Sequence, residues 1–254
     1  MALTIDLSGK TALVTGASRG IGTAISKGLA KAGADVVGIG TTIETGVPDL
    51  KAELNTYGAR FTPINCDLSS RDQISALVKR LARDQVQIDI LVNNAGIIRR
   101  TEAASHPVAD WDAVMAVNLD AAFLLSRDFG GKMVERGSGK IINIASVLSF
   151  QGGILVPGYA AAKGAIAQLT RSFANEWASK GVNVNAVAPG YIATDNTAAL
   201  QADEKRTADL MARVPAGRWG TPKDIAGPVT FLASDHSNFI HGAILPVDGG
   251  WLAR

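Results

Sequence analysis

The chain has 254 residues, of which 47% are hydrophobic and 19% charged, and its net charge is +2. This composition predicts a single globular domain over 1–254 with a large buried core, and it lacks the basic runs of nucleic-acid or anionic-membrane binders. No apolar run reaches transmembrane length, and the first ten residues do not resemble a signal peptide. The single cysteine, Cys66, excludes an internal disulfide, so we expect a cytoplasmic protein.

Short apolar runs alternate with amphipathic segments along the chain. Strands are expected at 10–15, 34–40, 60–66, 88–92, 139–146, 182–188 and 242–247, and helices near 20–32, 48–58, 70–84, 108–136, 157–180 and 222–234. The strands are continuously apolar, as expected when both faces of a sheet are covered. The order predicts an α/β fold: a doubly wound (Rossmann) seven-stranded parallel sheet flanked by helices, in one domain.

A glycine-rich turn follows the first predicted strand. Gly16, Gly20 and Gly22 lie between the apolar run 10–15 and the helical pattern after it. Strand, turn and helix in this order are typical of a dinucleotide site, because glycines allow a tight turn and the helix N-terminus accepts a pyrophosphate. If this motif stood alone, the alternative interpretation would be a glycine-rich turn that binds no ligand.

The stretch 146–163 places three polar residues at informative spacings. Lys163 follows Tyr159 by four residues, which sets the ammonium beside the phenol on one helix face. Free tyrosine has a pKa of about 10, so a nearby cation is needed before it can act as a base at neutral pH. A hydroxyl from Ser146 would polarise a carbonyl or alcohol. Together these groups can move a proton while a cofactor moves a hydride.

Residues 190–221 interrupt the alternation between the sixth and seventh predicted strands. The segment mixes polar residues with a weak helical pattern. Insertions at the carboxyl edge of a parallel sheet often cover a ligand. We therefore expect 190–221 to form a substrate lid.

Several stretches together resemble the short-chain dehydrogenase/reductase family over nearly the whole chain. They are TGASRGIG (15–22), CDL (66–68), NNAG (93–96), Asn118 in AVNLD, Ser146, YAAAK (159–163) and PGYIAT (189–194). The resemblance implies a Rossmann-fold oxidoreductase that uses a nicotinamide cofactor.

Within that family the chain most resembles the 2-deoxy-D-gluconate 3-dehydrogenases, also called 2-dehydro-3-deoxy-D-gluconate 5-dehydrogenases. The stretches that carry this are NNAGIIRR (93–100), GKIINIASVLSFQGGI (139–154), NEWA (175–178), VPAGRWG (214–220) and VDGGWLAR (247–254). The implied reaction is hydride transfer between the cofactor and a secondary alcohol or ketone of a deoxy sugar acid. A 3-oxoacyl-[acyl carrier protein] reductase is the alternative enzyme. A non-catalytic dinucleotide sensor is disfavoured, because it would not need an intact catalytic set.

The family resemblance also implies catalytic roles. Tyr159 would be the general acid and base, Lys163 would lower its pKa and bind the nicotinamide ribose, and Ser146 would bind the reacting oxygen. Asn118 would hold a water that links Lys163 to solvent. Asn118 also falls on an otherwise apolar helix face, where a carboxamide needs partners. Local backbone groups are the alternative partners.

Cofactor contacts follow from the same resemblance. The phosphate turn would comprise Gly16, Ser18, Arg19, Gly20, Ile21 and Gly22; the adenosine side Asp67, Leu68, Asn93, Asn94, Ala95 and Gly96; and the nicotinamide side Tyr159, Lys163, Pro189, Gly190, Ile192 and Thr194. For Asp67, a helix N-cap is the alternative.

The sequence leaves the choice between NAD and NADP open. No acid follows the second strand until Glu44, and Arg19 could meet a 2′-phosphate, and both features favour NADP. The sugar-acid resemblance favours NAD, which we expect as the cofactor.

A sugar-acid substrate would bring a carboxylate, which guanidinium groups bind through paired hydrogen bonds. The candidate substrate residues are Arg99, Arg100, Ser146, Gln151, Tyr159 and Arg218. For the adjacent arginines, a solvated pair is the alternative. Trp219 and Trp251 either shape this pocket or simply pack.

Partners other than the small-molecule substrate are not indicated. The three histidines lack ligand spacing, so no metal site is expected.

The helices 108–136 and 157–180 carry much apolar surface, and in the family such helices pair between subunits, which implies a homotetramer. The C-terminal WLAR could then reach a neighbouring subunit.

Overall fold

The computed structural model describes residues 4–254, apart from the side chain of Ala199. Its centre is a seven-stranded parallel sheet in the order β3-β2-β1-β4-β5-β6-β7. The strands are β1 (Thr11–Thr15), β2 (Asp35–Gly40), β3 (Phe61–Asn65), β4 (Ile90–Asn93), β5 (Gly139–Ile144), β6 (Val182–Pro189) and β7 (Ile244–Val247). The chain winds outward in both directions from the β1–β4 pair, which confirms the predicted doubly wound fold.

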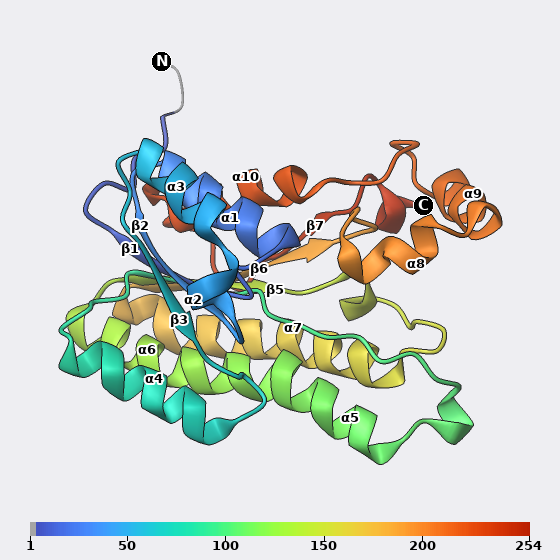
Figure 1. Ribbon diagram of the computed structural model, residues 1–254, viewed down its shortest axis with the longest axis horizontal. Helices are drawn as coiled ribbons and strands as arrows, with labels where there is room; N and C mark the ends of the chain where they lie inside the picture. The colour runs from blue at the N-terminus through green and yellow to red at the C-terminus, as the bar shows by residue number, and fades with distance from the viewer. Residues whose placement is uncertain (1–3) are drawn as a thin grey trace.

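Helices cover both faces of the sheet (Figure 1). One face carries α1 (Gly20–Lys31), α3 (Pro48–Thr56) and α10 (Pro222–Ala233); the other carries α4 (Arg71–Arg83), α5 (Val108–Met115), α6 (Ala121–Arg136) and α7 (Pro157–Trp177). Two apolar cores result, one between the sheet and each helix layer. Every residue of β6 is buried, including Asn183 and Asn185, whose amides donate hydrogen bonds to backbone carbonyls near Ile240.

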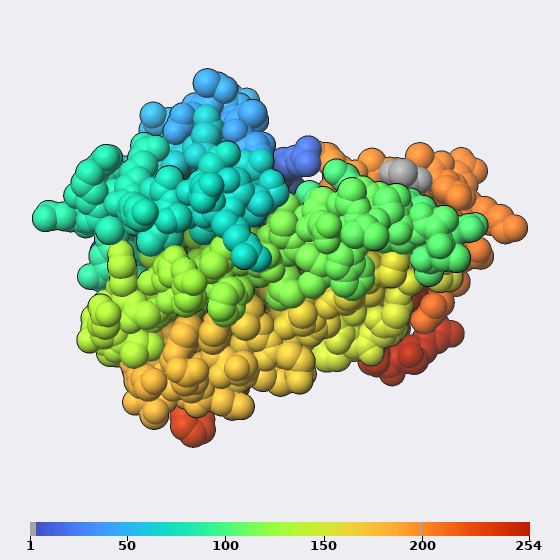
Figure 2. Space-filling view, turned by 90° about the horizontal axis from the view of Figure 1, so that it is seen from below, coloured from blue at the N-terminus to red at the C-terminus, as the bar shows by residue number. Residues whose placement is uncertain are grey.

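The view from below shows the second helix layer as a continuous surface (Figure 2). There α6 and α7 lie side by side. Phe173 stacks on Trp177 with ring centroids 4.3 Å apart, and Phe123 lies 6.3 Å from Phe173. Phe173 and Trp177 are largely buried, whereas Phe123 is exposed. The apolar content of these helices therefore serves mainly the core.

The predicted helix 108–136 is interrupted by a π-helical turn, Ala116–Asp120. Such a turn adds one residue to the helical repeat and changes which face the following side chains occupy. It contains Asn118, which is buried. A short helix that the sequence pattern did not indicate, α2 (Ile43–Gly46), follows β2.

The segment 190–221 folds over the carboxyl edge of the sheet. It contains a 3₁₀ turn (Asp195–Thr197), α8 (Ala198–Gln201) and α9 (Glu204–Arg213), which project beyond the sheet in Figure 1. A parallel bridge between Ile192 and Gly220 joins the two ends of the segment. The segment is thus a loop closed at its base.

Candidate active site

A cleft of about 590 Å³ opens at the carboxyl edge of the sheet. Sequence-predicted residues from separate parts of the chain line it: Gly16, Ser18, Arg19, Gly20, Ile21, Gly22, Asp67, Leu68, Asn94, Ala95, Gly96, Arg99, Ser146, Tyr159, Lys163, Pro189, Gly190, Ile192 and Thr194. The fold therefore brings the glycine turn and the serine–tyrosine–lysine group into one cavity, at the position where doubly wound sheets bind ligands.

The glycine turn forms one end of the cleft. Gly16 and Gly20 have φ values of +66° and +54°, which favour glycine. A Cβ on Gly22 would lie 2.0 Å from the carbonyl oxygen of Gly16. The first turn of α1 has no acidic residue and no side-chain cap. This cradle fits a dinucleotide pyrophosphate, because its shape depends on the missing side chains and the helix N-terminus is free for an anion.

Thr15 and Asn94 hold the floor beneath that turn. The Thr15 hydroxyl accepts hydrogen bonds from the N–H groups of Asn94 and Ala95 at 2.9 and 3.0 Å. The Asn94 amide donates to the Thr15 carbonyl at 2.8 Å. Asn93, expected on the adenosine side, instead donates to Ser126 and Asn143 inside the core. The resemblance also implied that Asn93 stabilises the central sheet, and the bond to Asn143 of β5 confirms this role. Asn93 does not line the cleft, because successive side chains of a strand point to opposite faces.

Asp67 lines the cleft beyond β3. Its carboxylate accepts bonds from the Ser69 N–H and hydroxyl at 2.9 and 2.7 Å. The N-cap of α4 is Ser70, whose hydroxyl accepts from the Gln73 N–H. Asp67 is therefore not the helix cap that the sequence left as an alternative.

The end of β2 carries Thr41 and Thr42 into the cleft, with no acidic side chain beside them. The nearest candidate, Glu44, is turned toward β3, where its carboxylate accepts bonds from the N–H and amide of Asn65. Arg19 is exposed and lies 3.8 Å from Asp195. A carboxylate that could bind a ribose diol is absent among the residues that line the described cleft at this point.

Ser146, Tyr159 and Lys163 form the other end of the cleft. The Lys163 ammonium lies 5.6 Å from the centre of the Tyr159 ring, as the four-residue spacing predicts. It donates to the carbonyl oxygen of Ile144 at 2.5 Å. The Ser146 hydroxyl accepts from the Leu148 N–H at 3.1 Å, which orients it at the end of β5.

Burial changes the acidity of two of these groups in opposite directions. It raises the pKa of the Tyr159 phenol, while a hydrogen bond with Ser146 and the positive charge of Arg100 oppose that rise. Burial lowers the pKa of Lys163 to about 8. Both shifts favour the uncharged forms, so the charge state of the pair is sensitive to whatever enters the cleft.

Ser149 is a structural member of the site that sequence reasoning missed. Its hydroxyl donates to the Lys163 carbonyl at 2.6 Å and accepts from the Ser146 N–H at 3.3 Å. It therefore ties the backbones of Ser146 and Lys163 together. The serine spacing 146–149, which forms a capping box, was the available signal.

Asn118 reaches the same region from the π-helical turn. Its amide bonds both backbone groups of Ile97, accepting from N–H at 2.8 Å and donating to the carbonyl at 3.0 Å. The partners are backbone groups, as in the alternative left by the sequence, but they lie 21 residues away and are not local. A small cavity of about 10 Å³ is lined by both Asn118 and Lys163, and it has about the size that one water needs.

The predicted substrate arginines have three different environments. Arg99 lies 3.4 Å from the Asp110 carboxylate. Arg100 reaches across to the start of the lid, where it donates to the Asn196 carbonyl at 3.3 Å. Arg218 binds the Asp224 carboxylate through both terminal nitrogens.

The described structure does not bring Arg218 into the cleft. Asp224 belongs to the capping box of α10, and it holds the Arg218 guanidinium at that helix end, outside the residues that line the cleft. Gln151 is partly buried after β5, and neither it nor Arg100 is among the cleft-lining residues, which include Arg99.

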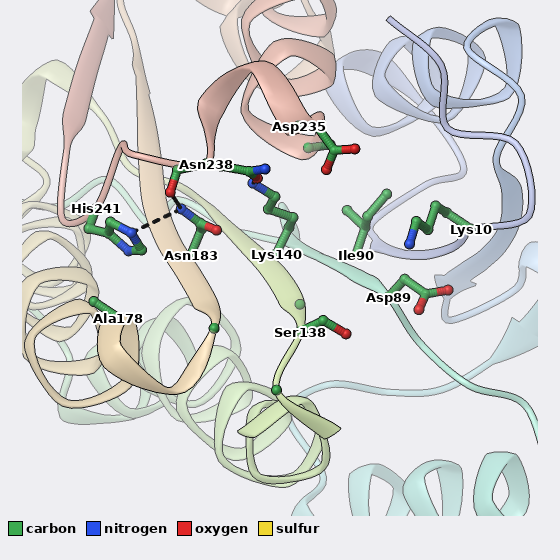
Figure 3. A pocket seen from close by; sticks show the side chains of 14 residues that line it. Lys10, Asp89, Ile90, Ser138, Lys140, Ala178, Asn183, Asp235, Asn238 and His241 are labelled. Atoms are coloured by element: carbon green, nitrogen blue, oxygen red, sulfur yellow. Dashed lines mark hydrogen bonds between the residues drawn. The ribbon is translucent and has the colours of Figure 1, made fainter. Parts of the chain in front are cut away.

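A second cavity, of about 350 Å³, lies at the opposite, amino edge of the sheet (Figure 3). The buried Lys140 donates there to Asn238 at 2.6 Å and to Ser237 at 3.3 Å. Burial lowers the pKa of Lys140 to about 8. Asn183 donates to the carbonyl oxygens of Asn238 and Ile240. These bonds fasten the strand ends to the loop before β7, so we assign the cavity a structural role.

Metal-binding clusters of three or more His, Cys, Asp or Glu residues are absent from the part of the chain that the structure describes. Over the same residues, none of the helices combines the length and apolar character needed to span a membrane.

Comparison with known protein families identifies the family to which the chain belongs. The family model adh_short_C2, described as enoyl-(acyl carrier protein) reductase, matches residues 16–252. The chain belongs to this short-chain dehydrogenase/reductase family. It is accordingly an oxidoreductase that uses a nicotinamide cofactor. The family description alone does not fix the substrate.

The chain is also similar to individual proteins over nearly its whole length. A 2-dehydro-3-deoxy-D-gluconate 5-dehydrogenase of Pseudoalteromonas atlantica is 55% identical over 98% of each chain. A crystal structure from Beutenbergia cavernae with NADP bound at low occupancy is 50% identical, with a TM-score of 0.95 and coverage of 99% and 100%. The gluconate 5-dehydrogenase of Burkholderia cenocepacia, in complex with NADP and tartrate, is 39% identical, with a TM-score of 0.93 and coverage of 99% and 98%.

Proposed function

We propose that the protein interconverts a secondary alcohol and a ketone on a deoxy sugar acid, of the 2-dehydro-3-deoxy-D-gluconate or 2-deoxy-D-gluconate type, with a nicotinamide cofactor. The observation that carries the proposal is the single cleft with a glycine turn at one end and Ser146, Tyr159 and Lys163 at the other. The names of the relatives support the substrate class.

The nicotinamide ring supplies or accepts the hydride when the cofactor is bound. The Ser146 hydroxyl, at the end of β5, binds the reacting oxygen. The Tyr159 phenol gives that oxygen a proton during ketone reduction and removes it during alcohol oxidation. Lys163 lies within 5.6 Å of the phenol ring and favours its ionised form. Asn118 secures the backbone of Ile97 beside them and shares the small cavity with Lys163.

Arg100 is the best-placed group for the substrate carboxylate. It is outside the cleft-lining residues but next to Arg99, which lines the cleft, and its positive charge opposes the raised pKa of Tyr159. Its one hydrogen bond within the described structure is to a backbone carbonyl, Asn196, which leaves donors for a ligand. Arg99 is paired with Asp110, and Gln151 is a secondary candidate. The tartrate bound by the Burkholderia cenocepacia relative is itself a carboxylate, which supports this assignment.

For the cofactor we propose NADP(H) in preference to NAD(H), which revises the expectation from sequence. The observations in favour are Thr41 and Thr42 at the end of β2, the Glu44 carboxylate held by Asn65, and the NADP in the relatives. A 2′-phosphate would be repelled by an acid at this point and is compatible with threonine hydroxyls and Arg19.

Three further features belong to the same proposal. Segment 190–221 acts as the substrate lid, since its first turn lines the cleft.

The protein acts in the cytoplasm. It assembles as a homotetramer, with the partly exposed Trp111 and Phe123 near the subunit contacts, which light scattering coupled to gel filtration would test.

The direct test is the rate of NADPH and NADH formation with 2-deoxy-D-gluconate, and of their consumption with the corresponding keto acids. Strong turnover of a sugar acid supports the proposal. Turnover of a 3-oxoacyl thioester without turnover of any sugar acid would overturn it in favour of an acyl reductase.

A further inference from the structure

The C-terminal turn Trp251–Ala253 lies against the lid at the end of the chain shown in Figure 1. Trp251 is only 3% exposed. It forms one cluster with side chains from three other parts of the site: Val147 after the catalytic serine, Tyr191 after the nicotinamide-side Pro189–Gly190 pair, and Leu210, Met211 and Val214 at the end of α9. A single indole therefore packs together the chain after Ser146, the chain after Gly190 and the end of α9.

Aromatic and cationic contacts orient this indole. The Tyr191 ring meets Trp251 edge-on, with centroids 4.8 Å apart, and meets Trp219 at 6.0 Å. The Arg213 guanidinium, in the last turn of α9, lies 4.0 Å above the Trp251 ring. Edge-on aromatic pairs and stacked guanidinium groups are both favourable and directional. Trp251 is thus held from two parts of the segment 190–221, by Tyr191 near its start and by Arg213 at the end of α9.

The backbone of the C-terminal segment is fixed in the same place. Asp248 accepts bonds from the N–H groups of Gly250 and Leu252. The Gly249 carbonyl accepts from Ala216 at 2.9 Å. A Cβ on Gly250, where φ is +90°, would lie 2.9 Å from the Pro215 side chain. The segment is therefore pressed closely against the chain that leaves α9.

Besides the Trp251 cluster, α9 is held by a bond from Thr207 to the Leu200 carbonyl and by one from Arg254 to the Ala212 carbonyl. None of the residues of α9, all of which the structure describes, is buried. Its apolar side chains Leu210 and Met211 pack on the Trp251 cluster. The position of α9, which follows the cleft-lining turn Asp195–Thr197 in the same segment, therefore depends on the surface that Trp251 presents.

We infer that Trp251 is a positioning residue: it seats the lid helix α9 and thereby sets the affinity for the substrate, without touching the substrate itself. The inference rests on the proposed function only in taking 190–221 as a substrate lid. The indole nitrogen of Trp251 has no hydrogen-bond partner in the described structure. The size and shape of the Trp251 ring, and not its N–H group, are therefore what positions α9.

The test compares Trp251→Ala with Trp251→Phe. We expect Trp251→Ala to raise KM for the sugar acid about tenfold while the cofactor Kd stays within about twofold. Trp251→Phe keeps an aromatic ring, so its KM should stay within about threefold of wild type. The matched control is Leu77→Ala, which opens a cavity under α4 on the other face of the sheet; it should lower Tm without changing KM.

A readout without substrate separates this inference from the proposed function. Lys205 and Arg206 in α9 are trypsin sites, and loss of the seat should speed cleavage there about tenfold in Trp251→Ala but not in Leu77→Ala. Unchanged cleavage and KM in Trp251→Ala, or equal defects in Trp251→Phe and Trp251→Ala, would overturn the inference. If the wild-type enzyme uses no sugar acid, the proposed function fails, and the trypsin comparison alone decides whether Trp251 seats the lid.

Discussion

The amide of Asn118 binds both backbone groups of Ile97, at 2.8 and 3.0 Å. This pair joins the π-helical turn to the chain that leaves β4, which carries the cleft-lining Gly96 and Arg99. The π-helical turn Ala116–Asp120 and the loop after β4 therefore hold each other in place. A regular helix through Ala116–Asp120 would turn this carboxamide away from its partners.

Replacing Asn118 by leucine should destabilise the protein by about 2 kcal/mol, because two buried backbone groups of Ile97 lose their partners. Urea unfolding measures this loss. Asn55→Leu, on an exposed position of α3, is the control and should change stability by less than about 0.5 kcal/mol. Equal stability of Asn118→Leu and wild type would contradict the structural role of the pair.

Tyr159→Phe should reduce turnover about a thousandfold, because the proton donor is removed while the ring remains. Fluorescence titration should show a cofactor Kd within about twofold of wild type, since phenylalanine preserves the shape of the cleft wall. Turnover near the wild-type rate would exclude Tyr159 as the acid and base, and full loss of cofactor binding would point to a structural defect.

Arg100→Met should raise KM for a hexonate about 30-fold and leave a neutral ketone unaffected, because only the former brings a carboxylate. The variant also removes a charge that opposes the raised pKa of Tyr159, so its rate of alcohol oxidation should rise only at higher pH than that of wild type. Arg218→Met is the matched control: its guanidinium is held by Asp224, and KM should not change. The same effect of Arg100→Met on both substrates would reject the carboxylate role.

Thr41→Asp should lower kcat/KM for NADPH about 50-fold and leave NADH equal or better, because a carboxylate at the end of β2 repels a 2′-phosphate and can bind a ribose diol. Thr45→Asp adds the same charge beyond the cleft-lining residues and serves as the control. A wild-type enzyme that already prefers NADH would show that the threonine pair does not determine cofactor choice.

The stability of the cofactor-free protein should rise between about pH 8 and 10. Burial lowers the pKa of Lys140 and of Lys163 to about 8, from 10.5 in the exposed side chain. In that window the two lysines bind more protons in the unfolded chain, so raising the pH favours folding; below it both states are protonated and their contribution ends. Above about pH 9 the buried Cys66, whose pKa is raised to about 11, offsets part of this rise.

Lys140→Met isolates one of these contributions. The difference in free energy of unfolding between wild type and Lys140→Met should change in favour of wild type from pH 7 to pH 9.5, as measured by urea titration. A difference that is constant over this range would show that the Lys140 ammonium is not desolvated in solution.

The sheet could be predicted closely from sequence. All seven expected strands are present, and their bounds differ by at most two residues, because continuous Val/Ile/Leu runs between helical segments have few other interpretations. Gly16, Gly22, Tyr159 and Lys163 line one cleft; local spacing predicted the glycine turn and the Tyr–Lys pair separately, and the family resemblance implied that they meet.

Features that depend on tertiary contacts were not predictable. The π-helical turn at Asn118 reflects the position of Ile97, which lies 21 residues away. The separation of Arg100 from Arg218 reflects ion pairing with Asp224 in α10, a helix that the site does not otherwise use. The environment of Glu44 depends on Asn65 of the neighbouring strand. Sequence patterns identify which residue types are present, but they do not show which hydrogen-bond or ion-pair partner each side chain has in the fold.

The close packing of the last residues against α9 bears on how the protein is handled. The Arg254 side chain donates to the Ala212 carbonyl at 3.0 Å, so an affinity tag fused after Arg254 would begin beside the lid. The described chain starts at Thr4, where its carbonyl contacts His236 far from the catalytic cleft. Kinetic constants measured on a C-terminally tagged preparation would therefore describe an altered enzyme, and an amino-terminal tag is the appropriate choice for purification and immobilisation.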